Sequence, residues 1–169
     1  SMNLKALTLE NHKNAERSKF AGILLSGSID PQLYYAYLCN QLMNYSALES
    51  KLPLGMLGLE DIARKNLIEE DMRELEDKYS FTPTNTPIMN SVLKYVEHVE
   101  HLSSKNPRGL LAHLYVRHFG DMYGGAIIAS KVPSKGAMYK FENIDLLKER
   151  VRSLLQDDMA IDANECFEY

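Results

Sequence analysis

The residues best suited to chemistry lie in the glycine-rich segment Gly120-Asp121-Met122-Tyr123-Gly124-Gly125. An aspartate carboxyl beside a ligand pocket can hold water and pass protons. The apolar spacing of residues 110–129 predicts a helix here, in which three glycines cost about 3 kcal/mol relative to alanine. Gly120 and Gly124 share a helix face, so their bare backbone could lie against a flat ligand.

Two plainer interpretations of this segment stay open on composition alone. Glycine pairs kink helices, so the glycines could mark a bend or a close helix crossing. Arg117 precedes Asp121 by four residues, and such a pair could be a surface ion pair worth a few tenths of a kcal/mol.

The histidines are the second group capable of chemistry. His98 and His101 stand beside Glu97 and Glu100, but the Glu-x-x-His spacing of di-iron bundles is missing, which indicates a polar helix face. His12 shares a helical face with apolar residues, so it is expected to point inward. Lys5 lies seven residues earlier. A histidine and a lysine on one face suit a heme, whose iron needs an axial ligand and whose propionates need cations.

Composition limits the class of protein. A chain of 169 residues with 45% apolar content fits one domain over residues 1–169, with Ser1 interpreted as a cloning remnant. The net charge of −4 argues against nucleic-acid binding. The sequence has no apolar run of about 20 residues and no apolar leader, so neither a membrane span nor a signal peptide is expected. Cys39 and Cys166 form no disulfide pattern, and a cytoplasmic location is expected.

The elements that must position these residues are all helical. No segment alternates apolar and polar residues as a strand does, so the predicted fold class is all-α with six or seven helices. Asp30-Pro31 is a typical helix start, and the acidic run 69–74 is interpreted as a solvated face. A turn is predicted at 133–136. The predicted helices cover about 3–18, 31–48, 59–79, 88–102, 107–131 and 143–156.

Together these features resemble the heme oxygenase family, in its bacterial, cyanobacterial or phage branch. Residues 4–16 are similar to the family's N-terminal signature, and residues 115–125 are similar to its distal-helix signature. Residues 45–49 resemble the second-helix segment whose tyrosine joins the distal water network. The resemblance implies a single-domain helical fold that sandwiches heme b between a proximal helix and a kinked distal helix.

The resemblance also implies residue roles. His12 would be the proximal ligand of the heme iron, and Asp121 would deliver protons on the oxygen side, helped by Arg117 and Tyr45. Lys148 and Arg152 are four residues apart in the last predicted helix, like the family's propionate-binding bases. The implied heme-contacting residues are His12, Lys5, Glu16, Tyr115, Gly120, Gly124, Gly125, Lys148 and Arg152.

The implied reaction is the oxidative cleavage of heme, as both substrate and cofactor, by O2 to biliverdin, CO and Fe2+. The implied partners are an external electron donor, such as ferredoxin or another reductase, and a downstream bilin reductase; a monomer is expected. Leu9 and Tyr123 depart from the family's usual residues, and the chain ends where relatives continue into a final helix. The alternatives are a non-enzymatic heme carrier or sensor, a thiaminase-like hydrolase using Cys39, and a non-heme iron oxidase.

Overall fold

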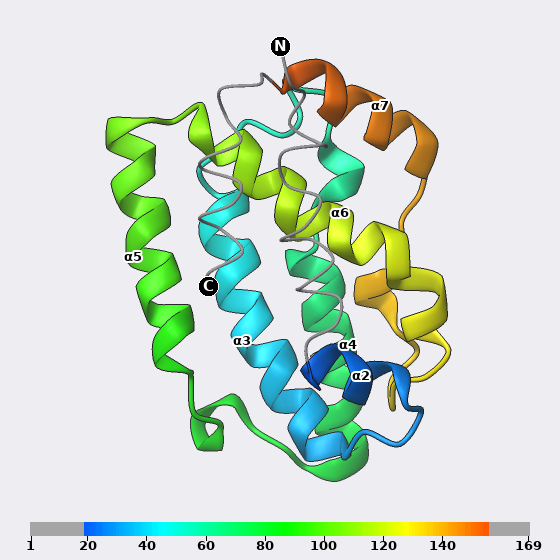
Figure 1. Ribbon diagram of the computed structural model, residues 1–169. Coiled ribbons are helices and arrows are strands. Elements are labelled where there is room, and N and C mark those ends of the chain that lie inside the picture. Colours follow the sequence, from blue (N-terminus) through cyan, green and yellow to red (C-terminus); the bar gives the residue numbers. More distant parts are fainter. Residues whose placement is uncertain (1–18, 156–169) are drawn as a thin grey trace.

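The computed structural model describes residues 19–155 of the chain (Figure 1). These residues contain six α-helices and three short 3₁₀ helices. No β-strand occurs within these residues, and the predicted all-α class is confirmed. The predicted helix over 3–18 lies outside the described residues. The elements are α2 (Lys19–Leu25), α3 (Pro31–Glu49), η1 (Glu60–Ile62), α4 (Lys65–Tyr79), η2 (Pro83–Asn85), α5 (Asn90–Lys105), α6 (Gly109–Ala129), η3 (Ala137–Tyr139) and α7 (Ile144–Leu154).

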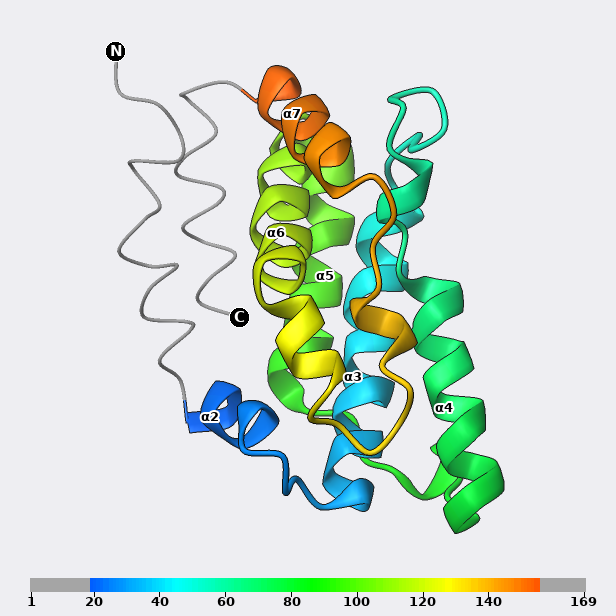
Figure 2. The ribbon, with the colours of Figure 1, turned by 90° about the vertical axis from the view of Figure 1, so that its right-hand side faces the viewer.

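The helix α3 is the central element, and α4 and α6 lie on opposite sides of it (Figure 2). One hydrophobic cluster joins the end of α3 to α5, α6 and α7 around Tyr95, Leu110 and Phe119. A second cluster joins α3, from Tyr34 to Tyr45, to α4 and η3 around Leu38 and Ile68. Tyr45 belongs to the second cluster, while Phe119 and Met122 of α6 belong to the first. Tyr45 and the neighbouring part of α6 therefore lie where the two hydrophobic clusters meet.

The start of α3 follows from its local sequence. The side chain of Asp30 accepts a hydrogen bond from the backbone N–H of Leu33 at 3.1 Å, and Pro31 occupies the first helical position. A cap of this kind satisfies an N–H that has no partner inside the helix, and proline lacks one to satisfy. The predicted helix start at Pro31 is confirmed.

The predicted start of the next helix is wrong. A continuous helix from Leu59 was expected, but η1 ends at Ile62, Ala63 is extended, and α4 begins at Lys65. The carboxylate of Glu49, from α3, accepts the backbone N–H groups of Arg64 at 2.8 Å and Lys65 at 3.2 Å. These donors at the first turn of α4 are capped by a residue of another helix, which no local pattern could indicate.

The acidic run on α4 is only partly a solvated face. Glu70 and Arg73 are exposed as expected, but Asp71 is 1% exposed. Its carboxylate accepts three hydrogen bonds, from the Ser134 hydroxyl at 3.0 Å and the backbone N–H groups of Ala137 at 2.9 Å and Met138 at 2.8 Å. The interpretation of the whole run as solvated is therefore wrong at Asp71, which fastens the turn before η3 to α4.

The helix α6 runs without interruption from Gly109 to Ala129, so the expected kink does not break its hydrogen-bond pattern. The turn predicted after it is present, and Gly136 adopts a φ of +73° that disfavours any residue with a side chain. The first and last residues of α5, α6 and α7 each lie within three residues of the predicted ones. No helix among residues 19–155 is long and apolar enough to cross a membrane.

Candidate functional site

The centre of the candidate site is the carboxyl group of Asp121, half-buried on α6 where this helix faces α3. The fully buried Tyr45 of α3 places its hydroxyl within hydrogen-bonding distance of Asp121 Oδ2 and 2.9 Å from the carbonyl oxygen of Arg117. When Asp121 is ionised, this hydroxyl donates to the carboxylate. When Asp121 is protonated, the acid can donate to the Tyr45 oxygen while Tyr45 donates to the carbonyl. Both protonation states are therefore satisfied without movement of Tyr45.

Burial is the largest influence on the pKa values of Asp121 and Tyr45. It raises the pKa of Asp121 from 3.8 to about 6, although the Tyr45 hydroxyl and the charges of His118, Arg64 and Arg117 oppose the rise. Burial and the charge of Asp121 raise the pKa of Tyr45 well above 10, so Tyr45 keeps its proton. Asp121 can therefore exchange a proton close to neutral pH, while Tyr45 serves as a donor.

His118, one turn before Asp121 on α6, is a site residue that sequence reasoning missed. Its ring is 0% exposed and lies edge-on to the Tyr45 ring, with centroids 4.7 Å apart. Nε2 lies 2.9 Å from Oε2 of Glu49, and Nδ1 lies 3.2 Å from the carbonyl oxygen of Leu114. The available signal was the i, i+3 spacing to Asp121, which places both side chains on one helix face.

Arg64 is a second missed residue. Its guanidinium is 1% exposed and donates to four carbonyl oxygens, which belong to Asp61, Ile62, Met138 and Lys140. It also lies over the ring of Phe141 at 3.6 Å from the centroid. Arg64 thus ties η1 to the η3 segment and adds a positive charge near Asp121. Long-range carbonyl partners leave no trace in the local sequence.

Two further tyrosine hydroxyls, those of Tyr37 and Tyr139, lie close enough to Asp121 to respond to its charge. Tyr37 of α3 and Tyr139 of η3 are hydrogen-bonded to each other at 2.9 Å. Burial, together with the charge of Asp121, raises the pKa of both phenols. They therefore remain neutral hydroxyls that respond to the charge of Asp121.

Arg117, a predicted helper of Asp121, and Tyr115, a predicted heme-contacting residue, lie in different surroundings. The Arg117 guanidinium lies over the Tyr95 ring of α5, 4.2 Å from its centroid, and the backbone carbonyl of Arg117 meets Tyr45. Tyr115 is buried in the hydrophobic cluster against Phe119, with ring centroids 4.7 Å apart. The structure thus brings Tyr45 to Asp121, while the Tyr115 ring packs in the core.

The glycines of α6 divide into two kinds. A Cβ on Gly125 would lie 2.6 Å from the carbonyl oxygen of Tyr139, so helix packing against η3 requires a bare backbone there. A Cβ on Gly124 would meet the end of the Ile128 side chain at 3.4 Å and no other described atom within 4 Å. Close packing within the described part of the chain therefore explains Gly125 but not Gly124. Gly120 is half-buried on the same face as Gly124.

The two predicted propionate-binding bases lie together on α7. The Lys148 ammonium is 4.2 Å from the centroid of the Tyr123 ring, and Nη2 of Arg152 donates to the Tyr123 hydroxyl at 2.9 Å. Tyr123, one of the departures from the family pattern, therefore holds both cations beside the glycine-rich part of α6. His12, Lys5 and Glu16 lie outside the described residues.

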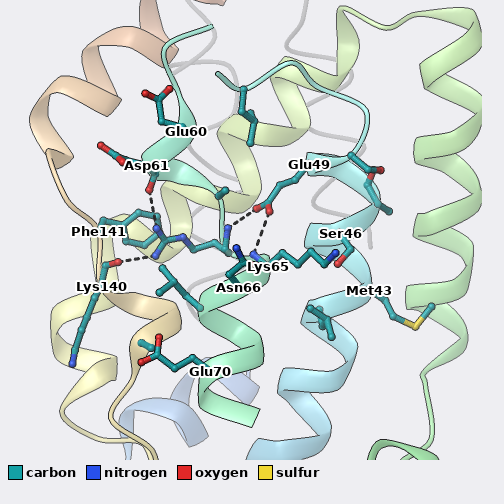
Figure 3. Close-up of a pocket in the computed structure, with 18 of the residues that line it drawn as sticks. Met43, Ser46, Glu49, Glu60, Asp61, Lys65, Asn66, Glu70, Lys140 and Phe141 are labelled. Carbon is teal, nitrogen blue, oxygen red and sulfur yellow. Dashed lines mark hydrogen bonds between the residues drawn. The ribbon is translucent and has the colours of Figure 1, made fainter. Parts of the chain in front are cut away.

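A large cavity lies on the other flank of the molecule and does not include Asp121. Its volume is about 1280 Å³, and it is lined by α3, the start of α4, α5 and the segment 135–142. Figure 3 shows Glu49 beside Lys65 at its edge. The backbone carbonyl oxygens of Asp61 and Lys140 accept hydrogen bonds from the guanidinium of Arg64. Both acidic and basic residues line it, so it has no single charge preference. Within residues 19–155, no three His, Cys, Asp or Glu side chains come together to hold a metal ion.

Fold and site together define an all-helical protein with a titratable acid on a glycine-rich helix. The chain belongs to the heme oxygenase family, because the family model described as heme oxygenase matches residues 1–164. It is 28% identical to heme oxygenase 2 of Macaca fascicularis over 98% of this chain and 61% of that protein. It is 27% identical to heme oxygenase of Rhodella violacea over 85% of this chain and 67% of that protein. The chain spans about three fifths of the length of the mammalian relatives.

Solved structures share the fold. Heme oxygenase from Leptospira interrogans superposes with a TM-score of 0.81 at 24% identity, covering 98% of this chain and 93% of that one. Heme oxygenase-1 of the cyanobacterium Synechocystis, in complex with heme, superposes with a TM-score of 0.82 at 23% identity, covering 98% and 86%. The heme oxygenase fold predicted from the sequence is thereby confirmed.

Proposed function

We propose that this protein is a heme oxygenase that cleaves heme to biliverdin, CO and Fe2+ with O2 and electrons from an external donor. The observation that carries the proposal is Asp121, a carboxyl whose pKa of about 6 suits proton exchange, on the bare part of α6. A protein that merely holds heme has no need of such a group.

The described residues fit a heme in two respects. Gly124 has a bare backbone that packing among residues 19–155 does not require, and Lys148 and Arg152 are paired cations next to it. Cations of this kind can bind propionates, and exposed backbone allows a flat ring to approach closely. Gly120 and Gly124 would face the ring, and Lys148 and Arg152 would bind its propionates. His12 as iron ligand, with Lys5 and Glu16 nearby, remains a proposal from the sequence.

When bound, heme supplies the iron that activates O2 and the macrocycle that is opened. The chain's own contribution is to hold and move a proton at the Asp121 carboxyl. Tyr45 keeps that carboxyl in place by donating to it, and the Arg117 carbonyl keeps the Tyr45 hydroxyl satisfied when Asp121 is protonated. Asp121 can therefore give up a proton and regain it without rearrangement of the site.

The competing enzyme classes have less support. A thiaminase-like hydrolase needs an activated thiolate, but Cys39 is a buried free cysteine whose pKa is raised by burial. A non-heme iron oxidase needs a cluster of carboxylates and histidines, which residues 19–155 do not contain. A heme carrier or sensor is the alternative that the decisive experiment must separate.

The experiment is a hemin titration followed by reduction. We expect a Soret band on adding hemin, and its loss with growth of a verdin band once ferredoxin and its reductase, or ascorbate, are supplied under air. A stable Soret band under reduction would favour a carrier, and the absence of any Soret band would overturn heme binding. His12→Ala should change the axial-ligand spectrum, and added imidazole should restore turnover.

The partners stay predictions from the family. An electron donor is implied by the reaction, and ferredoxin is the proposed one; a downstream bilin reductase is proposed as consumer of the product. A monomer and a cytoplasmic location are likewise proposed. The hemin experiment with ferredoxin, compared with ascorbate alone, tests the choice of donor.

A further inference from the structure

The helix α6 buries two histidines, His113 and His118, and their hydrogen bonds differ in kind. Nδ1 of His113 lies 3.2 Å from the Tyr95 hydroxyl, which can either donate or accept. Burial lowers the pKa of His113 to about 3, helped by the charges of His98 and Arg117, so this ring is neutral. His113 is thus a core residue with one neutral partner.

His118 instead faces acceptors at both ring nitrogens. Nδ1 lies 3.2 Å from the Leu114 carbonyl oxygen, which cannot donate. Nε2 lies 2.9 Å from Oε2 of Glu49, which also accepts the backbone N–H of Arg64 at 2.8 Å, while Oε1 accepts that of Lys65 at 3.2 Å. Because the Glu49 carboxyl already accepts two backbone N–H groups, it serves as the acceptor for Nε2, and a ring that donates from both nitrogens is an imidazolium.

This ion pair is almost entirely withdrawn from water. The side chains of His118 and Glu49 are 0% and 8% exposed. Charges in such a place interact strongly with their neighbours, because little solvent screens them. His118 is three residues from Asp121 on one helix face and packs edge-on against Tyr45, the hydrogen-bond partner of Asp121. The His118–Glu49 pair therefore acts on the site in two ways. The His118 ring packs against Tyr45, and the His118 charge acts on Asp121.

We propose that His118, kept as an imidazolium by Glu49, is a positioning residue that fixes Tyr45 and holds Asp121 as a carboxylate near neutral pH. Its positive charge favours the ionised form of Asp121, against the burial that opposes it. The value of this charge for turnover rests on the proposed function, but the effect on Asp121 does not. The described ionisable groups that face Asp121 from the packed elements are Tyr34, Tyr37 and Tyr45 of α3, Arg64 before α4, Tyr139 of η3, and Arg117 and His118 of α6.

The test is a ¹³C NMR titration of the Asp121 carboxyl in the heme-free protein, with the signal assigned through Asp121→Asn. In His118→Gln we expect the midpoint to rise by about two pH units, the effect of losing a unit charge about one helical turn away at an effective dielectric constant of about 20. His113→Gln is the matched control, because it removes a buried but neutral histidine of the same helix. It should leave the midpoint unchanged.

An unchanged midpoint in a folded His118→Gln protein would overturn the proposal, as would an equal rise in His113→Gln. If His118→Gln does not fold, ¹⁵N NMR of the wild-type histidine rings decides. We expect both ring nitrogens of His118 to carry a proton in the wild type, as their two acceptors require, and only one of them to do so in Glu49→Gln. A wild-type ring with a proton on one nitrogen alone would contradict the proposal. Because no heme is present, neither result depends on the proposed reaction.

Discussion

Two aspartates on opposite sides of α3, the buried Asp71 of α4 and the half-buried Asp121 of α6, have different surroundings. Burial raises the pKa of both carboxyls. Asp71 accepts three hydrogen bonds, two of them from backbone N–H groups that cannot move away. The hydrogen-bond partner of Asp121 among the described residues is the single hydroxyl of Tyr45.

The difference separates an acid that builds the fold from one that is available for chemistry. The lone pairs of Asp71 are occupied by donors of the 134–138 turn, so a proton or a ligand would have to displace structural bonds. Asp121 keeps acceptor capacity, lies beside bare backbone, and has a partner that serves either of its protonation states. The structural role of Asp71 and the chemical role of Asp121 therefore differ because of the number and rigidity of their hydrogen-bond donors, more than because of burial itself.

The largest expected effect is that of Asp121→Asn, which tests whether Asp121 is the acid that takes part in the chemistry. We expect verdin formation to fall by about 100-fold to 10,000-fold, the range for loss of a proton-transferring group, while the Soret titration with hemin stays unchanged. At pH 4, where folded Asp121 is neutral as Asn is, the free energy of unfolding should change by less than about 1 kcal/mol, since Asn can still accept from Tyr45. Single-turnover absorbance measurements check the first expectation. Normal turnover would remove Asp121 from proton delivery.

Asp71→Asn should show the converse behaviour. The amide NH2 would face backbone N–H donors, so we expect a loss of about 3 kcal/mol in the free energy of unfolding. Urea denaturation followed by circular dichroism measures it, with Ser134→Ala, which removes one donor, as a milder control. The folded fraction of the variant should convert heme at the wild-type rate. Wild-type stability in this variant would show that the three bonds are not structural.

The pH dependence of stability sharpens the comparison further. The folded pKa of Asp121, about 6, lies above its ordinary value of 3.8, so protonated Asp121 favours the folded state. That contribution is complete below pH 3.8 and is lost as the pH rises through 6. Relative to Asp121→Asn, the wild type should lose up to about 3 kcal/mol between pH 4 and pH 7. A constant difference between the two unfolding curves would contradict the raised pKa.

The smallest expected effects come from the adjacent glycines. Gly125→Ala places its Cβ 2.6 Å from the Tyr139 carbonyl oxygen, so we expect a loss of about 2 kcal/mol in stability. Gly124→Ala meets only the Ile128 side chain at 3.4 Å among described atoms, and should gain up to about 1 kcal/mol from helix propensity. Thermal unfolding of the heme-free proteins distinguishes them. A hemin titration of Gly124→Ala then reports whether this face contacts the ring, and unchanged affinity would argue that it does not.

Much of the architecture was predictable because its causes are local. Asp30 and Pro31 start α3 with side-chain and ring chemistry that acts within three residues. The helical period places Asp121 and the glycines on α6 without reference to any partner. The start of α4 was not predictable, because its cap is Glu49, fifteen residues earlier on another helix. Propensity and periodicity carry no information about such a partner.

The sequence by itself determined the all-α class, the family, and the pairing of a titratable acid with bare backbone, since each depends on residue type and short spacing. Only the tertiary structure decided which acid is saturated and which is available. Asp71 meets donors 63 to 67 residues away, and His118 meets Glu49 at a separation of 69 residues. The physical reason is that burial, donor number and charge depend on which helix faces meet, and a residue's neighbours along the chain do not specify its neighbours in space.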